Sequence, residues 1–299
     1  MRPFPPTPAM KTLRALAAFT LFAILSTGCA TRTPSRSDAE KLGWTLAVHS
    51  YSFRLFTIYD AIDKTAALGI KHMSISGSVL LSGTNPVTTV NLSDKDMEAI
   101  KAKMLSAGIS WPFVNIGVVQ LPPNQAQSRK VFDFARKWQI PILVAEPEPA
   151  ALDVVEKLCK EYHIKVAIHE HKKPNRYWNP EFVLAAIKDR GPLMGACADV
   201  GHWVRSGLDP VECLKKLDGH VLAVHFKDLA EKDPNTHDVP WGTGVCNCKG
   251  LLAELKRQQF HGAICVEYEY NWLNSSPEIA QSAAFFNSAC AQLAAPTAK

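Results

Sequence analysis

Strand-like and helix-like segments alternate along most of the chain, and this alternation constrains the fold more than any other feature. The strand-like segments are short, nearly continuous apolar runs, and each is followed by a segment with the apolar spacing of a helix. Strands that are apolar on both faces and separated by helices are typical of a parallel sheet with helices on both sides. Strands are expected at residues 44–48, 70–75, 110–115, 141–145, 164–169, 193–198, 221–226 and 263–267.

Helices are expected between these strands, at residues 58–67, 94–107, 125–138, 150–162, 180–189, 210–217, 250–259 and 277–293. Eight such units in about 250 residues match the size of a closed (β/α)8 barrel. The predicted fold is therefore α/β, a single TIM barrel over residues 43–295. A doubly wound open sheet is the alternative, but its dinucleotide-binding form needs a GxGxxG turn after an early strand, and none stands there.

The N-terminus has the features of a bacterial export signal. Lys11 and Arg14 precede an apolar run at 15–25, which is too short to span a bilayer and fits a signal peptide of residues 1–28. The run ends in LSTGC, which resembles the lipobox of bacterial lipoproteins, with Leu25 one place earlier than usual. We expect lipidation of Cys29 and an exported, membrane-anchored protein that faces the periplasm.

Residues 29–42 are polar and contain Pro and Ser, which predicts a flexible tether between anchor and barrel. Beyond residue 28 the chain carries 30 basic and 28 acidic residues, without the clustered basic face of a nucleic-acid-binding protein. We therefore expect no nucleic-acid partner, and membrane contact only through the lipid. Seven cysteines follow Cys29, and their odd number leaves at least one thiol free.

Four of the expected strands end on a residue that can bind a divalent metal. These residues are His169, Asp199, His225 and Glu267. The carboxyl ends of parallel barrel strands meet at one mouth, where TIM barrels carry their chemistry, so two imidazoles and two carboxylates should converge there. Mixed nitrogen and oxygen ligation favours Mn, Zn, Co or Fe over Mg or Ca, and one such ion is expected.

Side chains alternate along a strand, so residues two apart share a face. The pairs that this rule turns toward the expected site are His169 with His171, His225 with Lys227, and Glu267 with Glu269. By the same rule Glu170 points the other way.

The motifs at these strand ends resemble the xylose isomerase-like TIM-barrel superfamily, in its sugar phosphate isomerase/epimerase branch. The resemblance covers roughly residues 43–290, and the opening LAVHSYSFR, with His49, resembles the first strand of the family. Asp199-Val200-Gly201-His202 matches the D-x-x-H of the sixth strand, which implies that Asp199 binds metal and that His202 contacts substrate.

The sequence HFKD from His225 matches the H-x-x-D/E of the seventh strand, whose His binds metal, and Glu267 matches the eighth-strand Glu, a ligand and proton-transfer group. The chain departs from the family at the fifth strand, where a Glu is usual and His169 stands instead. His169 can still bind metal, and Glu146, at the end of the fourth strand, is the candidate for the missing carboxylate.

The resemblance implies a metal-dependent sugar isomerase or epimerase that abstracts a proton next to a carbonyl through an enediolate. The candidate catalytic residues are Glu267, Glu146 and His171, and the candidate substrate-binding residues are His202, Arg205, Lys227, Trp203 and His49. The partner is a small sugar or sugar derivative, and the oligomeric state is left open. Two alternatives remain: a lyase or hydratase acting on an oxidised (3-oxo) glycoside or inositol derivative, and a noncatalytic sugar-binding lipoprotein.

Overall fold

Eight parallel strands close into a barrel in the computed structural model, which describes residues 1–3 and 36–295. The barrel strands are β1 (Trp44–His49), β2 (Met73–Ser76), β5 (Ile116–Val119), β6 (Ile142–Ala145), β7 (Lys165–His169), β8 (Met194–Asp199), β9 (Val221–Phe226) and β12 (Gly262–Val266). The barrel closes where β1 pairs with β12, in register from Trp44 opposite Gly262 to Val48 opposite Val266. The predicted single TIM barrel is confirmed.

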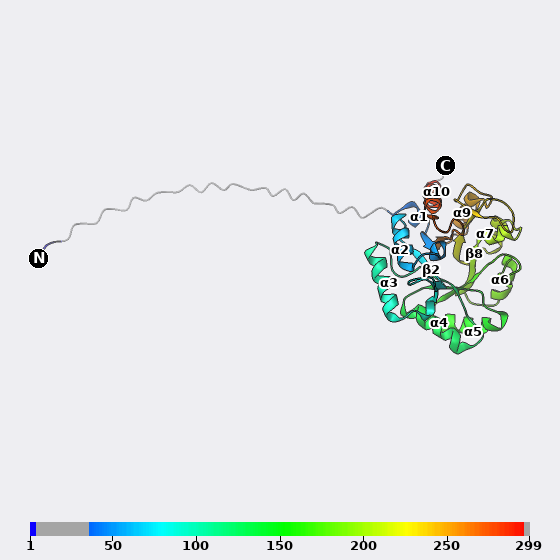
Figure 1. Ribbon diagram of the computed structural model, residues 1–299, viewed down its shortest axis with the longest axis horizontal. Coiled ribbons are helices and arrows are strands. Elements are labelled where there is room, and N and C mark those ends of the chain that lie inside the picture. Colours follow the sequence, from blue (N-terminus) through cyan, green and yellow to red (C-terminus); the bar gives the residue numbers. More distant parts are fainter. Residues whose placement is uncertain (4–35, 296–299) are drawn as a thin grey trace. The chain divides into compact units, whose positions relative to one another are not determined.

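Helices surround the barrel, as Figure 1 shows. They are α1 (Asp38–Lys41), α2 (Ile58–Ala67), α3 (Asp94–Ser106), α4 (Gln125–Lys137), α5 (Leu152–Tyr162), α6 (Pro180–Ile187), α7 (Val200–Arg205), α8 (Pro210–Lys216), α9 (Cys248–Arg257) and α10 (Ser276–Ala294). Several begin where their sequence predicts, because polar side chains bind the first free backbone N–H groups. Thr57, for example, caps α2 in a capping box with Asp60.

The third barrel strand lies later than predicted. Residues 110–115 run beside β2 and bond to it, from Ser110 N–H to the Lys71 carbonyl and from Val114 N–H to the Met73 carbonyl. Pro112 interrupts this segment, and a proline has no N–H to donate to a ladder. The regular strand therefore begins only at Ile116.

Two short helices were not predicted. Helix α1 occupies residues 38–41, so the last part of the expected tether is helical, and Leu42 packs against the core. Helix α7 follows β8 directly, with the side chain of Asp199 accepting the His202 N–H at its start. The predicted signal peptide beyond residue 3, and Cys29, lie outside the described residues.

The barrel interior beneath the strand ends is filled by small side chains. Each of five neighbouring strands places an alanine or a cysteine two residues before its last inward-facing position: Ala47, Ala167, Cys197, Ala223 and Cys265. These residues are almost completely buried. TIM barrels usually fill this space with branched residues, so the small residues let the strand-end side chains sit deep in the mouth.

Within residues 36–295, two small hairpin-like sheets and three short 3-10 helices lie in the loops. The sheets are β3 (Ser78–Val79) with β4 (Val87–Thr88) and β10 (Asp228–Leu229) with β11 (Asp238–Val239), and the 3-10 helices are η1 (Ser50–Phe53), η2 (Thr89–Asn91) and η3 (Pro149–Ala151). Among the described helices, none has the length and apolar content that crossing a membrane requires.

Candidate metal centre and active site

The four predicted metal ligands come together at the barrel mouth. His169 ends β7, Asp199 ends β8, His225 lies next to the end of β9, and Glu267 directly follows β12. One potential ligand atom from each lies within 4.8 Å of all the others, and all four residues are buried. The register explains the convergence, because Asp199 lies opposite His225 across the β8–β9 ladder.

The missing hydrogen-bond partners of His225 among the described residues indicate that this cluster suits a cation. Both ring nitrogens of His225 are buried and have no hydrogen-bond partner among the described residues. Its Nδ1 lies 3.0 Å from Glu267 Oε2, but without the alignment of a hydrogen bond. A buried polar atom without a partner is costly, and a metal ion would accept an imidazole lone pair. Two imidazoles and two carboxylates are a donor set that fits a transition-metal ion.

Glu146 holds His169 from behind. Its Oε1 lies 2.8 Å from His169 Nδ1, and its Oε2 accepts a hydrogen bond of 2.7 Å from Asn175 Nδ2. The opposite ring nitrogen, His169 Nε2, faces Asp199 Oδ2 at 3.6 Å. Burial alone would lower the pKa of His169, but the carboxylates of Asp199 and Glu146 outweigh burial and raise it to about 9. Glu146 thus orients a candidate ligand, as carboxylates commonly do behind metal-binding histidines.

Lys227 lies within the cluster. Its ammonium is 2.5 Å from Asp199 Oδ2 and 2.5 Å from Glu267 Oε2, and the side chain is buried. Burial would lower the pKa of Lys227, but the two carboxylates raise it well above its ordinary value. Burial would likewise raise the pKa of Glu267, yet Lys227 and His225 keep it well below its usual range. The two carboxylates are therefore ionised beside a fixed positive charge.

Gly201 makes room for this lysine. A Cβ atom at Gly201 would lie 2.8 Å from Lys227 Cδ and 2.9 Å from Lys227 Cβ. Any other residue would push the lysine stem away from the two carboxylates. This contact gives a physical reason for glycine between Asp199 and His202.

His49, at the end of β1, packs against the cluster. Its ring stacks on His225 with centroids 4.8 Å apart, and its Nε2 lies 3.7 Å from Glu267 Oε1. Nδ1 is 2.8 Å from Ser74 Oγ, which donates to Asn115 Oδ1. Burial lowers the pKa of His49 to about 3, so the ring is neutral.

A cavity of about 220 Å³ opens above the cluster. Its lining includes His49, Glu146, His169, His171, His202 and Glu267. The rings of His171 and His202 lie 4.1 Å apart, and Nδ1 of His202 is buried without a partner among the described residues. Burial lowers the pKa of His202 well below its ordinary value. The cavity wall thus offers imidazoles to a ligand.

Arg205 belongs to an outer ring of charges at the rim. It donates to Asp238 Oδ1, and to Glu269 Oε2 at 3.0 Å. Burial raises the pKa of Asp238 to about 6, against the opposing effect of Arg205. Arg205 also lines a rim cavity of about 350 Å³, which shares Tyr51, His171 and His202 with the cavity above the cluster.

Two predicted substrate contacts lie elsewhere. Trp203 is completely buried, and its Nε1 donates a 3.0 Å hydrogen bond to Glu170 Oε1, so it does not reach the cavity. Trp203 directly follows His202 in α7, and one residue along a helix turns the side chain by about 100°. Lys227 is held by carboxylates and lines none of these cavities. The expected opposite orientation of Glu170 is confirmed.

Sequence reasoning missed several residues of the site. Tyr51, Ser76, Gly117 and Val118 line the cavity, and Asp238 anchors Arg205. Tyr51 follows His49 by two positions and could have been found in the same motif. Asp238 comes from a loop, and no periodic pattern marks it.

A TIM barrel with a buried His/Asp/His/Glu cluster at its mouth is the class of protein that the fold and site define. The sequence model of one family, the xylose isomerase-like TIM barrel, matches residues 147–289. The chain belongs to this xylose isomerase-like TIM-barrel superfamily, as the motifs predicted. No curated protein sequence matches it.

Solved structures agree with this fold. An uncharacterised protein from Parabacteroides distasonis is 34% identical, with 82% of this chain and 99% of that chain covered and a TM-score of 0.64. A D-tagatose 3-epimerase-like protein is 16% identical, with 83% and 98% covered and a TM-score of 0.64. A Bacillus anthracis protein assigned as a 3-DHS dehydratase of petrobactin synthesis is 13% identical, with 81% and 98% covered and a TM-score of 0.63.

Proposed function

We propose that the chain is a divalent-metal-dependent isomerase or epimerase of a sugar or sugar derivative. The observation that carries the proposal is the buried cluster of His169, Asp199, His225 and Glu267, with ligand atoms within 4.8 Å of one another beneath an open cavity. The similarity in fold to an epimerase-like protein supports the reaction class.

The reaction proposed is removal of a proton next to a carbonyl group. The cluster would hold the metal, which when bound polarises a carbonyl and so acidifies the neighbouring C–H. Around it, Lys227 keeps Glu267 ionised, and His171 and His202 line the wall where hydroxyl groups of a sugar would lie. Glu267 and His171 are the proposed proton-transfer groups, and they lie just beyond the ends of two different strands, β12 and β7.

A lyase or dehydratase is the second candidate, and one observation favours it. Both oxygens of Glu146 are engaged, by His169 and Asn175, so a second free carboxylate does not face the cavity from β6. Proton transfer opposite Glu267 then falls to an imidazole such as His171, which can act as a general acid toward a leaving hydroxyl or alkoxide. The similarity in fold to a protein assigned as a dehydratase is compatible with this outcome.

A solvent-exchange experiment tests both candidates. Metal-loaded protein would be incubated in D2O with a panel of ketoses, aldoses and 3-oxo-glycosides, and products analysed by NMR and mass spectrometry. We expect an epimer or isomer with deuterium at one carbon next to a carbonyl from the first function, and an unsaturated product with a free leaving group from the second. Asp199→Asn should abolish either outcome. Full metal occupancy with neither deuterium incorporation nor an unsaturated product from any member of the panel would contradict both functions.

A further inference from the structure

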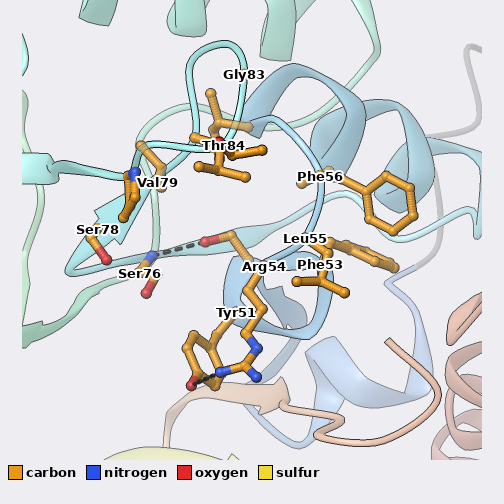
Figure 2. A pocket seen from close by; sticks show the side chains of 15 residues that line it. Tyr51, Phe53, Arg54, Leu55, Phe56, Ser76, Ser78, Val79, Gly83 and Thr84 are labelled. Atoms are coloured by element: carbon orange, nitrogen blue, oxygen red, sulfur yellow. Dashed lines mark hydrogen bonds between the residues drawn. The ribbon is translucent and has the colours of Figure 1, made fainter. Parts of the chain in front are cut away.

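A second pocket lies beside the reaction cavity, between the loops that follow β1 and β2. It has a volume of about 370 Å³, within the range of small-molecule sites. Figure 2 shows Thr84 on one side of it and Tyr51 and Arg54 on the opposite side. Its apolar lining consists mainly of Phe53, Leu55, Phe56, Ile58, Val79 and Leu80.

This pocket adjoins the reaction cavity through shared walls. Tyr51 and Ser76 line both, and Tyr51 also lines the rim cavity. The junction is braced, because the Ser76 N–H donates a 2.8 Å hydrogen bond to Ser50 Oγ and Arg54 Nη1 donates one of 2.7 Å to the Tyr51 hydroxyl. A molecule that reacts at the cluster can therefore extend past Tyr51 into the second pocket.

The chemistry of the lining selects the group that would enter. Among its described lining residues there is no Asp, Glu, Asn or Gln, the side chains that commonly accept and share hydrogen bonds with sugar hydroxyls. The single charged residue, Arg54, lies at the mouth, with its guanidinium 4.1 Å above the ring of Trp272. Leu55 is 50% exposed in the empty pocket, and an apolar ligand would cover it. The other polar side chains of the lining are hydroxyls, from Ser50, Tyr51, Ser76, Ser78 and Thr84, and those of Ser50 and Tyr51 already accept hydrogen bonds. The lining therefore fits an aromatic or alkyl group better than a second sugar.

We propose that this pocket is an aglycone subsite, so that the substrate is a glycoside carrying an apolar group rather than a free sugar. The inference rests on the proposed function only for the position of the sugar ring above the metal cluster. It deepens that function by naming the substrate class, and it favours neither epimerisation nor elimination.

Equilibrium binding separates this subsite from the reaction itself. Calorimetry on the metal-loaded full chain would compare methyl with 4-nitrophenyl glycosides of glucose, galactose and mannose. Burying the aromatic ring should make the nitrophenyl glycoside of at least one sugar bind about tenfold tighter than its methyl counterpart. Equal affinities for every methyl and nitrophenyl pair would overturn the proposal.

Two tryptophan substitutions on one loop locate the effect. Thr84→Trp should fill the pocket and remove the preference for the nitrophenyl group, while methyl glycosides bind as before. Ser82→Trp places the same indole on an exposed neighbour that does not line the pocket, and should keep the preference. Loss of the preference in both variants, or in neither, would contradict the location.

The solvent-exchange experiment distinguishes failure of the subsite from failure of the proposed reaction. Deuterium exchange without any nitrophenyl preference would leave the proposed function standing and remove the subsite. A nitrophenyl preference lost only in Thr84→Trp, with neither deuterium incorporation nor elimination on any substrate, would establish the subsite and remove the proposed reaction.

Discussion

Single side chains set the state of the candidate metal centre before any ion binds. Glu146 fixes one face of His169, so that Nε2 faces Asp199, and Lys227 places one positive charge between the two carboxylates that would bind the ion. Glu146 was expected to transfer protons. We propose a positioning role for it instead, because each of its oxygens already has a partner.

Glu146→Gln tests this positioning role. The substitution keeps a hydrogen-bond acceptor for His169 but removes the negative charge, and should weaken metal affinity by about tenfold. Metal titration with elemental analysis measures the change. Glu148→Gln, on the exposed surface of the same loop, is the matched control and should bind metal normally. If Glu146→Gln instead loses turnover while its metal affinity is unchanged, Glu146 acts as an acid or base rather than as a positioning residue.

Glu170→Gln should stabilise the protein above neutral pH. Glu170 is completely buried, only one of its oxygens has a partner among the described residues, and burial raises its pKa well above the usual value. The unfolded chain then loses this proton at lower pH than the folded protein does, so stability falls as pH rises above the unfolded pKa of about 4.3. The side-chain amide of the variant would not ionise, so the stability of the variant would not fall with pH for this reason.

Denaturant unfolding at pH 5 and pH 8 measures that difference. The variant's advantage should grow from pH 5 to pH 8, by about 1.4 kcal/mol for each pH unit over which only the unfolded chain is ionised. Glu161→Gln, on the surface, is the control and should lose stability slightly, because its carboxylate pairs with Arg129. An advantage for Glu170→Gln that does not grow with pH would contradict a buried, protonated carboxyl.

Residue patterns predicted the candidate ligands but not their neighbours. His169, Asp199, His225 and Glu267 were identifiable because each terminates an apolar run, and parallel strands end at one mouth. The pairing of Lys227 with two of them depends on the depth of its side chain and on the missing Cβ of Gly201. Those are properties of packed side chains, which strand periodicity does not encode.

At the scale of elements, strands and helices were predicted well where apolar periodicity is strong, and less well where a single residue interrupts it. Strand β9 has the predicted bounds, whereas β5 begins after Pro112 rather than before it. Helix α7 was missed because its six residues are all buried and so lack an amphipathic pattern. Loops were least predictable, because their structure depends on side-chain contacts such as those of Asp228.

Asp228 organises the loop that follows β9. Its two carboxylate oxygens accept the N–H groups of Leu229, Gly242, Gly244 and Cys246 at 2.8–3.0 Å. A Cβ at Gly244 would lie 2.6 Å from Asp228 Oδ1, so glycine is needed for this close approach. The same loop carries Asp238, and therefore holds Arg205 at the rim.

Asp228→Asn should loosen this loop. The amide of Asn can accept at only one of its two positions, so backbone donors lose their partner at about 1–3 kcal/mol each. We expect a lower melting temperature and faster amide hydrogen exchange at residues 238–246. Asp233→Asn changes an exposed aspartate of the same loop region that accepts one N–H, and should have little effect. Equal melting temperatures for both variants would contradict the organising role of Asp228.

At the scale of the whole molecule, the sequence predicted a single barrel because eight strand–helix units can bury their strands by closing a sheet. The predicted export signal cannot be compared with the fold in this way, because its residues lie outside the described part of the chain. We propose that residues 1–28 direct export, and that Cys29 carries the lipid that anchors the barrel on the periplasmic side of a membrane. The motif LSTGC supports this proposal.

Cys29→Ser tests the proposed anchor. Without the thiol no lipid can be attached, and stable membrane binding needs acyl chains. Cell fractionation should show the wild-type protein with membranes and the variant in the soluble periplasmic fraction. Cys290→Ser, which removes a buried cysteine, should fractionate like wild type. Membrane retention of Cys29→Ser would contradict lipidation.

The buried layer of alanine and cysteine side chains beneath the cluster makes the barrel mouth a dead end. On the proposed function, an ion and a sugar would use the same opening, and the ion would bind deeper than the sugar. The ion would then have to bind before the sugar and dissociate after it. On the proposed function, a sugar held in the cavity would slow the loss of metal to a chelator, even if the affinity for the ion stayed the same.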